Sequence, residues 1–232
     1  MIVGERKPLG EIKELMQNYK KVLILGCGTC VSVCMAGGQK EVAILASQLR
    51  MDARLQEKDI IFTEDTIQRQ CDREYIEPVL EKAKSHDAVL SMACGAGVQL
   101  LAEMISPIPA IPALNTSFIG ITEEEGTWVE RCRGCGNCLL GDTGGICPVA
   151  RCAKSLFNGP CGGSIDGKCE VSPDTPCAWQ LIYDLLTERG QLERMESIQP
   201  IRDWRPSSYG VPRRVVREEM MPLGKGETEE HS

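Results

Sequence analysis

The chain has 232 residues, a net charge of −7 at pH 7 and aromatic residues at only 4% of its positions. Because the protein is acidic, it lacks the basic surface that nucleic-acid binding requires, and we expect no nucleic-acid partner. No apolar stretch reaches the length of a membrane-spanning helix, so we expect no membrane span.

The N-terminal segment, MIVGERKPLGEIKELMQNYKK, has neither the apolar core nor the small-residue cleavage site of a signal peptide. We therefore expect the protein in the cytoplasm, where thiols stay reduced. Apolar residues recur at helical spacing over residues 8–20 and predict an amphipathic helix there.

Short apolar runs alternate with helical segments along the next hundred residues. The first run, VLILG, ends in glycine and is typical of a parallel strand buried on both faces. The alternation predicts an α/β fold, with residues 1–122 forming a doubly wound parallel sheet of the Rossmann-like type. Strands are predicted at residues 22–26, 60–65, 87–94 and within 108–121, and helices at 39–55, 74–85 and 98–105.

Five cysteines fall at the ends of these predicted strands. Cys27, Cys30 and Cys34 follow the first strand, Cys71 follows the second and Cys94 ends the third. Parallel strands present their carboxyl ends at one edge, where open α/β sheets bind ligands. We expect four of the five thiols to bind a metal centre, either a 4Fe–4S cluster or zinc. Our preferred set is Cys30, Cys34, Cys71 and Cys94. The alternative is that some of these cysteines are only small buried core residues.

The segment from residue 132 to residue 177 is rich in glycine and poor in large apolar side chains, so it cannot build an ordinary hydrophobic core. Its eight cysteines must therefore stabilise it. Disulfides fit poorly, because the cytoplasm is reducing and the chain has thirteen cysteines, an odd number. Zinc and iron–sulfur clusters remain. The eight cysteines are Cys132, Cys135, Cys138, Cys147, Cys152, Cys161, Cys169 and Cys177.

The first three of these cysteines form a C-x2-C-x2-C run, which favours iron over zinc. Zinc ribbons use pairs of C-x2-C knuckles, whereas bacterial ferredoxin loops use three cysteines at this spacing and a remote fourth. Gly134 and Gly136 let the backbone approach the sulfurs and donate N–H bonds to them. We expect one 4Fe–4S cluster on Cys132, Cys135, Cys138 and a later cysteine, and a second on the remainder. One cluster plus one zinc ion is the alternative.

An acidic run at residues 121–128 separates these two parts. Residues 123–199 are therefore predicted to form a small, irregular, cysteine-rich iron–sulfur domain, with an amphipathic helix over residues 178–192. Residues 200–232 are rich in proline and charge, and predict an extended tail. This tail either docks onto a partner through Trp204 and Tyr209 or is disordered, above all over residues 224–232.

The sequence offers no catalytic residues apart from its metal ligands. Its two histidines, His86 and His231, do not lie near a plausible nucleophile–base pair. Glu64 and Asp65 follow a strand and could be functional, but we expect them in a solvated loop. Metal centres without a substrate site predict electron transfer.

Three segments carry a resemblance to a known family: GCGTCVSVC, SMACGAGVQ, and LFNGPCGGSIDGKCEV followed by CAW. They resemble the small iron–sulfur subunit of the methylenetetrahydrofolate reductase of acetogenic bacteria. The last segment is similar to the cysteine-rich C-terminal region of methylenetetrahydrofolate reductase. The resemblance extends over about residues 20–214 and is most specific at residues 158–171.

The resemblance implies an electron conduit. Ferredoxin or another donor would supply low-potential electrons, and the clusters would pass them to the flavin of a TIM-barrel partner subunit. That partner would reduce methylenetetrahydrofolate to methyltetrahydrofolate in the Wood–Ljungdahl pathway or a related one-carbon route. Two alternatives stay open: an electron-transfer subunit of another flavoenzyme or of a heterodisulfide-reductase-like complex, and a zinc-stabilised scaffold without a redox role.

Overall fold

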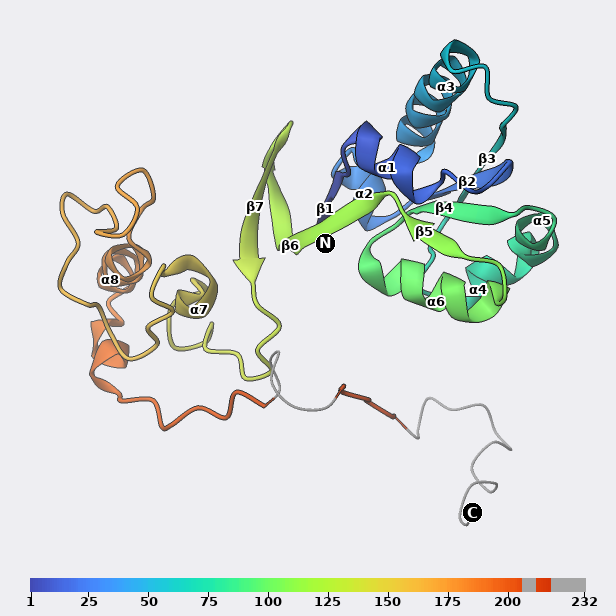
Figure 1. Cartoon of the computed structure of the whole chain (residues 1–232). Coiled ribbons are helices and arrows are strands. Elements are labelled where there is room, and N and C mark those ends of the chain that lie inside the picture. Colours follow the sequence, from blue (N-terminus) through green and yellow to red (C-terminus); the bar gives the residue numbers. More distant parts are fainter. Residues whose placement is uncertain (206–211, 218–232) are drawn as a thin grey trace.

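A computed structural model of the chain describes residues 1–205 and 212–217 (Figure 1). It shows an N-terminal part built of helices and a parallel sheet, and a C-terminal part made mostly of loops around short helices. A β-hairpin lies between these two parts. Three features singled out in the sequence, namely Tyr209, His231 and residues 224–232, lie outside the described residues.

The N-terminal part is organised around a parallel sheet with the strand order β3-β2-β4-β5. Each neighbouring pair in this sheet is parallel, which confirms an α/β fold with a parallel sheet. The assignment to the doubly wound, Rossmann-like type stays a prediction. The strands are β2 (Lys21–Cys27), β3 (Ile61–Ile67), β4 (Ala88–Met92) and β5 (Ala110–Pro112).

Helices cover both faces of this sheet, and alternate residues of β2 explain how. Val22 and Ile24 belong to the core cluster on one face, while Leu23 and Leu25 belong to the cluster on the other. Successive strand residues point to opposite faces, so a strand covered on both sides must be apolar throughout. One face is covered by α1 (Leu9–Leu15) and α3 (Gln39–Leu55), and the other by α4 (Arg73–Ile76), η1 (Glu77–Val79), α5 (Leu80–Lys84) and α6 (Gly95–Ile105).

The predicted helices differ from the observed ones mainly at their ends. The helix predicted over residues 39–55 is confirmed as α3. The helix predicted over residues 74–85 is divided into α4, η1 and α5. The helix is interrupted at Pro78, because proline has no N–H to continue the helical hydrogen bonds. The helix predicted over residues 8–20 ends at Leu15.

A second sheet, which the sequence did not predict, pairs a strand at the start of the chain with the two strands that follow β5. Its strands are antiparallel and follow the order β1-β6-β7. The further strand expected within residues 108–121 is therefore two strands, β5 in the parallel sheet and β6 in this one. The expected domain boundary after residue 122 lies inside β6, and the division into domains stays a prediction. The strands are β1 (Ile2–Arg6), β6 (Leu114–Glu124) and β7 (Thr127–Cys132).

The C-terminal part has little regular structure and a small apolar core. Trp179, Ile182 and Leu186 of helix α8 (Ala178–Glu188) form this core. The helix ends sooner than the predicted residue 192, because Gly190 adopts a left-handed φ of 64° that is typical of helix ends. Two further short helices are α7 (Pro148–Arg151) and η2 (Leu192–Glu196).

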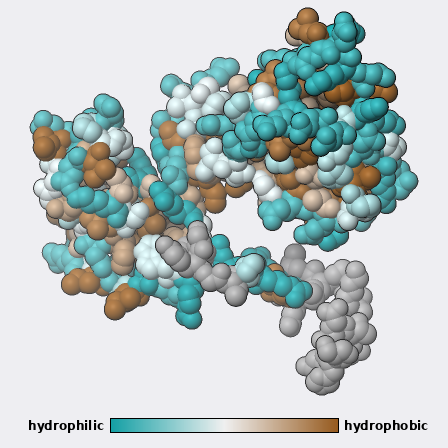
Figure 2. Space-filling model, viewed as in Figure 1, coloured by the Kyte–Doolittle hydropathy of each residue, from teal (hydrophilic) through white to brown (hydrophobic). Residues whose placement is uncertain are grey.

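Apolar side chains on the face shown in Figure 2 lie scattered over the C-terminal part among hydrophilic ones. This agrees with a part of the chain whose apolar core is small. Across the portions of the chain that the structure describes, no helix has the length and apolar character needed to cross a bilayer.

Candidate metal centres

The carboxyl edge of the parallel sheet brings together three cysteines from distant parts of the sequence. Cys27 ends β2, Cys71 follows β3, and Cys94 is the N-cap of α6, which begins earlier than predicted. Burial raises the pKa of the Cys71 thiol, and the neighbouring charges of Cys94 and Cys27 raise it further. The thiols of Cys27, Cys71 and Cys94 therefore lie near one another, as expected for the ends of parallel strands.

A buried glutamine fixes the loop that carries Cys71. Gln70 is fully buried, and its Nε2 donates hydrogen bonds to the carbonyl oxygens of Leu25 at 2.9 Å and Gly26 at 3.0 Å. Its Oε1 accepts a hydrogen bond from Ser91 Oγ at 2.7 Å. The side chain thus ties the loop after β3 to both β2 and β4. Sequence reasoning missed this residue, because a single glutamine after a strand carries no distinctive pattern.

Cys30 and Cys34 lie at the two ends of the one-turn helix α2 (Cys30–Val33). The Sγ atom of Cys34 is buried against β1, where it accepts a hydrogen bond from the Gly4 N–H at 3.5 Å and lies 3.6 Å from the Gly4 carbonyl oxygen. Burial raises the pKa of this thiol, so its thiolate is disfavoured. By contrast, Cys27 Sγ lies 4.0 Å from the carbonyl oxygen of Gln68, in the loop that leads to Cys71.

The geometry therefore favours Cys27 over Cys34 as the partner of Cys71 and Cys94. The preferred set of Cys30, Cys34, Cys71 and Cys94 stays a prediction. It includes Cys34, whose thiol is directed toward β1. The sequence could not distinguish Cys27 from Cys34, because both follow the first strand at short range.

A cavity of about 290 Å³ lies among the cysteines of the C-x2-C-x2-C run. Gly134 and Gly136 adopt left-handed φ angles of 60° and 82°, which let the loop turn tightly between the cysteines. The Gly134 N–H donates to Cys132 Sγ at 3.4 Å. The cysteines that line this first cavity are Cys132, Cys135, Cys138 and Cys147.

A second, much smaller cavity of about 20 Å³ collects the remaining cysteines of this part. The Gly163 N–H donates to Cys161 Sγ at 3.4 Å, which repeats the arrangement of Gly134 in the first cavity. Backbone N–H groups of Val171 and Ser172 lower the pKa of Cys169 and so favour its thiolate. The cysteines that line this second cavity are Cys152, Cys161, Cys169 and Cys177.

The helix α7 separates these two sets of cysteines. Cys147 is its N-cap and Cys152 its C-cap, so two cysteines close in sequence line different cavities. Val149 within α7 is buried. The eight cysteines are thus divided in chain order into two groups of four. The sequence predicted the first three members of the first group, and the structure adds Cys147 as the fourth residue of that cavity.

The cysteines that line the first cavity are of the donor type that an iron–sulfur cluster requires. Among the residues that the structure describes, no three or more histidine, cysteine, aspartate or glutamate side chains converge closely enough to hold one ion. A zinc ion needs its thiolates about 2.3 Å from one point. A four-iron cluster instead holds its thiolates apart and occupies the space between them. The four cysteines around a 290 Å³ cavity agree with the second requirement.

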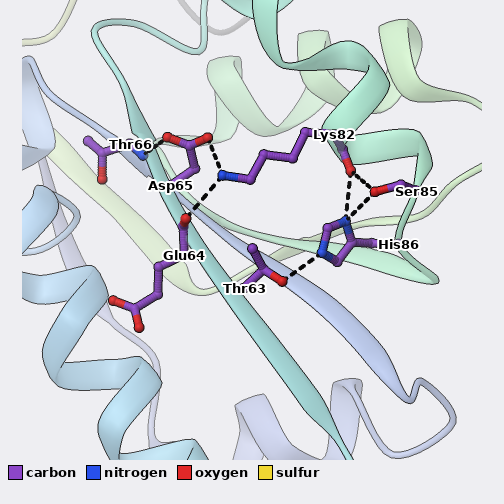
Figure 3. A network of polar contacts seen from close by, with 7 residues as sticks. All are labelled: Thr63, Glu64, Asp65, Thr66, Lys82, Ser85 and His86. Atoms are coloured by element: carbon purple, nitrogen blue, oxygen red, sulfur yellow. Dashed lines mark hydrogen bonds and ion pairs between the residues drawn. The ribbon is translucent and has the colours of Figure 1, made fainter.

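Glu64 and Asp65 lie within β3 and not in a solvated loop after the strand, and the polar residues around them have structural partners (Figure 3). His86 Nε2 lies 2.9 Å from Thr63 Oγ1, and its Nδ1 lies 2.7 Å from the Lys82 carbonyl oxygen. Lys82 Nζ forms an ion pair with Asp65 at 2.6 Å. Glu64 pairs with Arg50 of α3 at 2.6 Å. These contacts tie the helices on both faces to β3 and give each of these residues a structural partner.

Residues 111–205 match a family model described as "Methylene-tetrahydrofolate reductase C terminal". The matched range includes the β6–β7 hairpin, both cysteine-lined cavities and α8. No curated protein and no solved structure matches the chain. The chain is therefore similar to the C-terminal region of methylenetetrahydrofolate reductase over less than half of its length, and all eight cysteines of its C-terminal part lie within that similarity.

Proposed function

We propose that this protein is an iron–sulfur electron-transfer subunit of a methylenetetrahydrofolate reductase complex, which delivers electrons to the flavin of a partner subunit. One observation carries the proposal: eight cysteines divide into two groups of four, each around its own cavity, within the range similar to methylenetetrahydrofolate reductase. When bound, a 4Fe–4S cluster accepts and releases one electron at a time. The partner, a flavin-binding TIM-barrel subunit, performs the reduction of methylenetetrahydrofolate.

In the first cavity, Cys132, Cys135, Cys138 and Cys147 would hold the cluster. The size of this cavity and the four thiols that line it support a cluster. The Gly134 N–H, directed at Cys132 Sγ, favours the negatively charged thiolate that an iron ligand must provide.

In the second cavity, four cysteine thiols surround a much smaller volume, of about 20 Å³. Cys152, Cys161, Cys169 and Cys177 suit either a second cluster or a structural zinc ion, because both accept four thiolates. A second cluster would extend the electron path through this part of the protein. A zinc ion here would stabilise the loops and leave the first cavity as the redox site.

In the N-terminal part, we propose a third metal centre on Cys27, Cys71 and Cys94, with Cys30 as the fourth ligand. The convergence of the first three thiols at the carboxyl edge of the sheet supports this set. The sheet order and the two covered faces support a doubly wound, Rossmann-like arrangement around it. Ferredoxin or another cytoplasmic donor would supply the electrons for one-carbon metabolism of the Wood–Ljungdahl type.

Metal analysis of anaerobically purified protein tests the proposal. We expect iron and sulfide in the wild-type chain, a brown colour that dithionite bleaches, and reduction of the flavin in a co-purified barrel subunit. Cys135→Ser should lower the iron content and abolish flavin reduction. Cys34→Ser is the matched control, because its thiol is directed toward β1, and it should retain both properties. A colourless, folded wild-type protein containing only zinc would support a scaffold instead and would refute the proposal.

A further inference from the structure

Arg202 is a buried cation that no carboxylate neutralises among the described residues. Its relative exposure is 7%. Its Nη2 donates to Cys135 Sγ at 2.8 Å and also to the Asn137 carbonyl oxygen. Its Nε is buried and has no hydrogen-bond partner within the described part of the chain. A buried charge without a counter-charge is costly, so negative charge in the first cavity would stabilise it.

The other two arginines that line this cavity are each neutralised by a carboxylate. Arg131 pairs with Glu123 at 2.7 Å, and Arg133 pairs with Glu130 at 2.9 Å. Both therefore carry their own carboxylate partner at the rim of the cavity. Arg202 differs from them because its donors face a cysteine sulfur rather than an acidic side chain.

The segment that carries Arg202 is held across the C-terminal part. Gln199 and Asn158 exchange two hydrogen bonds, in which the Gln199 N–H donates to Asn158 Oδ1 at 2.7 Å and Asn158 Nδ2 donates to the Gln199 carbonyl at 3.0 Å. The Arg202 guanidinium lies over the Trp204 ring at 5.1 Å, and Trp204 packs edge-on against Phe157 at 6.1 Å. These contacts fix the guanidinium beside Cys135 before any ligand is bound.

We propose that Arg202 is a positioning residue that donates a hydrogen bond to the Cys135 sulfur and raises the reduction potential of the centre in the first cavity. This inference rests on the proposed function. Reduction adds one negative charge to the centre, and a fixed, buried cation stabilises the more negative state. Hydrogen bonds to ligand sulfur act in the same direction. The first and second centres would then differ in potential, because the two cations that line the second cavity, Arg151 and Lys154, make no hydrogen bond to a cysteine sulfur among the described residues.

Substitutions in the full, anaerobically reconstituted chain test the proposal. The variants are Arg202→Gln, Arg202→Lys and, as the matched control, Arg205→Gln. Arg205 lies in the same segment, but its exposed guanidinium pairs with Asp203 at 2.8 Å. The measurements are iron per chain and the midpoint potential of each centre by EPR-monitored titration. The signal of the first centre is identified by its loss in Cys135→Ser.

We expect Arg202→Gln to retain iron and to reduce the ratio of reduced to oxidised first centre about tenfold at a fixed potential, which is a shift of about 59 mV to more negative values for one electron. Arg202→Lys keeps the charge and should shift less. Arg205→Gln should shift neither centre. Equal potentials in Arg202→Gln and Arg205→Gln would overturn the assignment of Arg202 while leaving the proposed function intact.

A second measurement covers the case in which Arg202→Gln does not retain iron. Wild-type protein labelled with ¹⁵N-arginine should show a hyperfine coupling between the reduced first centre and a guanidinium nitrogen. The coupling should persist in Arg205→Gln and disappear in Arg202→Lys. Its absence from the wild type would overturn the proposal for Arg202. A wild type without iron in the first cavity would overturn the proposed function as well.

Discussion

Gln70→Leu should destabilise the parallel-sheet part and loosen the loop that carries Cys71. The substitution nearly conserves side-chain volume, but it removes the buried hydrogen bonds to the carbonyls of Leu25 and Gly26 and to the hydroxyl of Ser91. At about 1 kcal/mol for each of these bonds, the free energy of unfolding should fall by about 3 kcal/mol. The loss should be larger if the buried Ser91 hydroxyl finds no new partner.

Native-state hydrogen exchange of the metal-free protein is the suitable assay. The most protected amides of β2 and β4 report the unfolding of the parallel-sheet part alone, which a global denaturation curve would mix with the C-terminal part. Gln99→Leu is the matched control, because Gln99 is exposed and its Nε2 donates only to the Gly95 carbonyl, at 3.0 Å, among the described residues. The control should change stability by less than about 0.5 kcal/mol.

Two results would refute this reasoning. A loss of stability below about 1 kcal/mol in Gln70→Leu would mean that its buried hydrogen bonds do not hold the loop. An unchanged metal affinity of the N-terminal site, despite the expected loss of stability, would mean that Gln70 does not position Cys71. In that case the loop would keep its geometry through other contacts.

Two further predictions concern the N-terminal part. Cys27→Ser should remove the metal of the N-terminal site, while Cys34→Ser should retain it, because the Cys34 thiol is directed toward β1; metal loss in Cys34→Ser alone would contradict the set that we propose. Backbone N–H groups of Lys21 and Lys20 lower the pKa of Asp87. Its stabilising effect is therefore present above the usual aspartate pKa of about 3.9 and is lost as the pH falls through the lower, folded-state pKa. The difference in unfolding free energy between the metal-free wild type and Asp87→Asn should thus shrink below about pH 3.9, and a difference independent of pH would contradict this.

The local elements of this protein follow from its sequence alone. The continuous apolar run of β2 and the amphipathic pattern of α3 depend only on neighbouring residues, so both were predictable from the local sequence. The same holds for the gathering of cysteines after the strands, because parallel strands end at one edge whatever their order. The spacing of Cys132, Cys135 and Cys138 likewise indicates one site without any knowledge of the fold.

Which distant groups meet depends instead on the tertiary fold. The pairing of β1 with β6 joins residues more than one hundred positions apart, and that pairing places Gly4 against Cys34. The direction of α7 assigns Cys147 and Cys152 to different cavities. Gln70 and Arg202 act through side chains that reach across the fold, and nothing in their local sequence distinguishes them from solvent-exposed polar residues. Periodicity fixes which face of an element a side chain occupies, whereas long-range packing fixes what lies opposite that face.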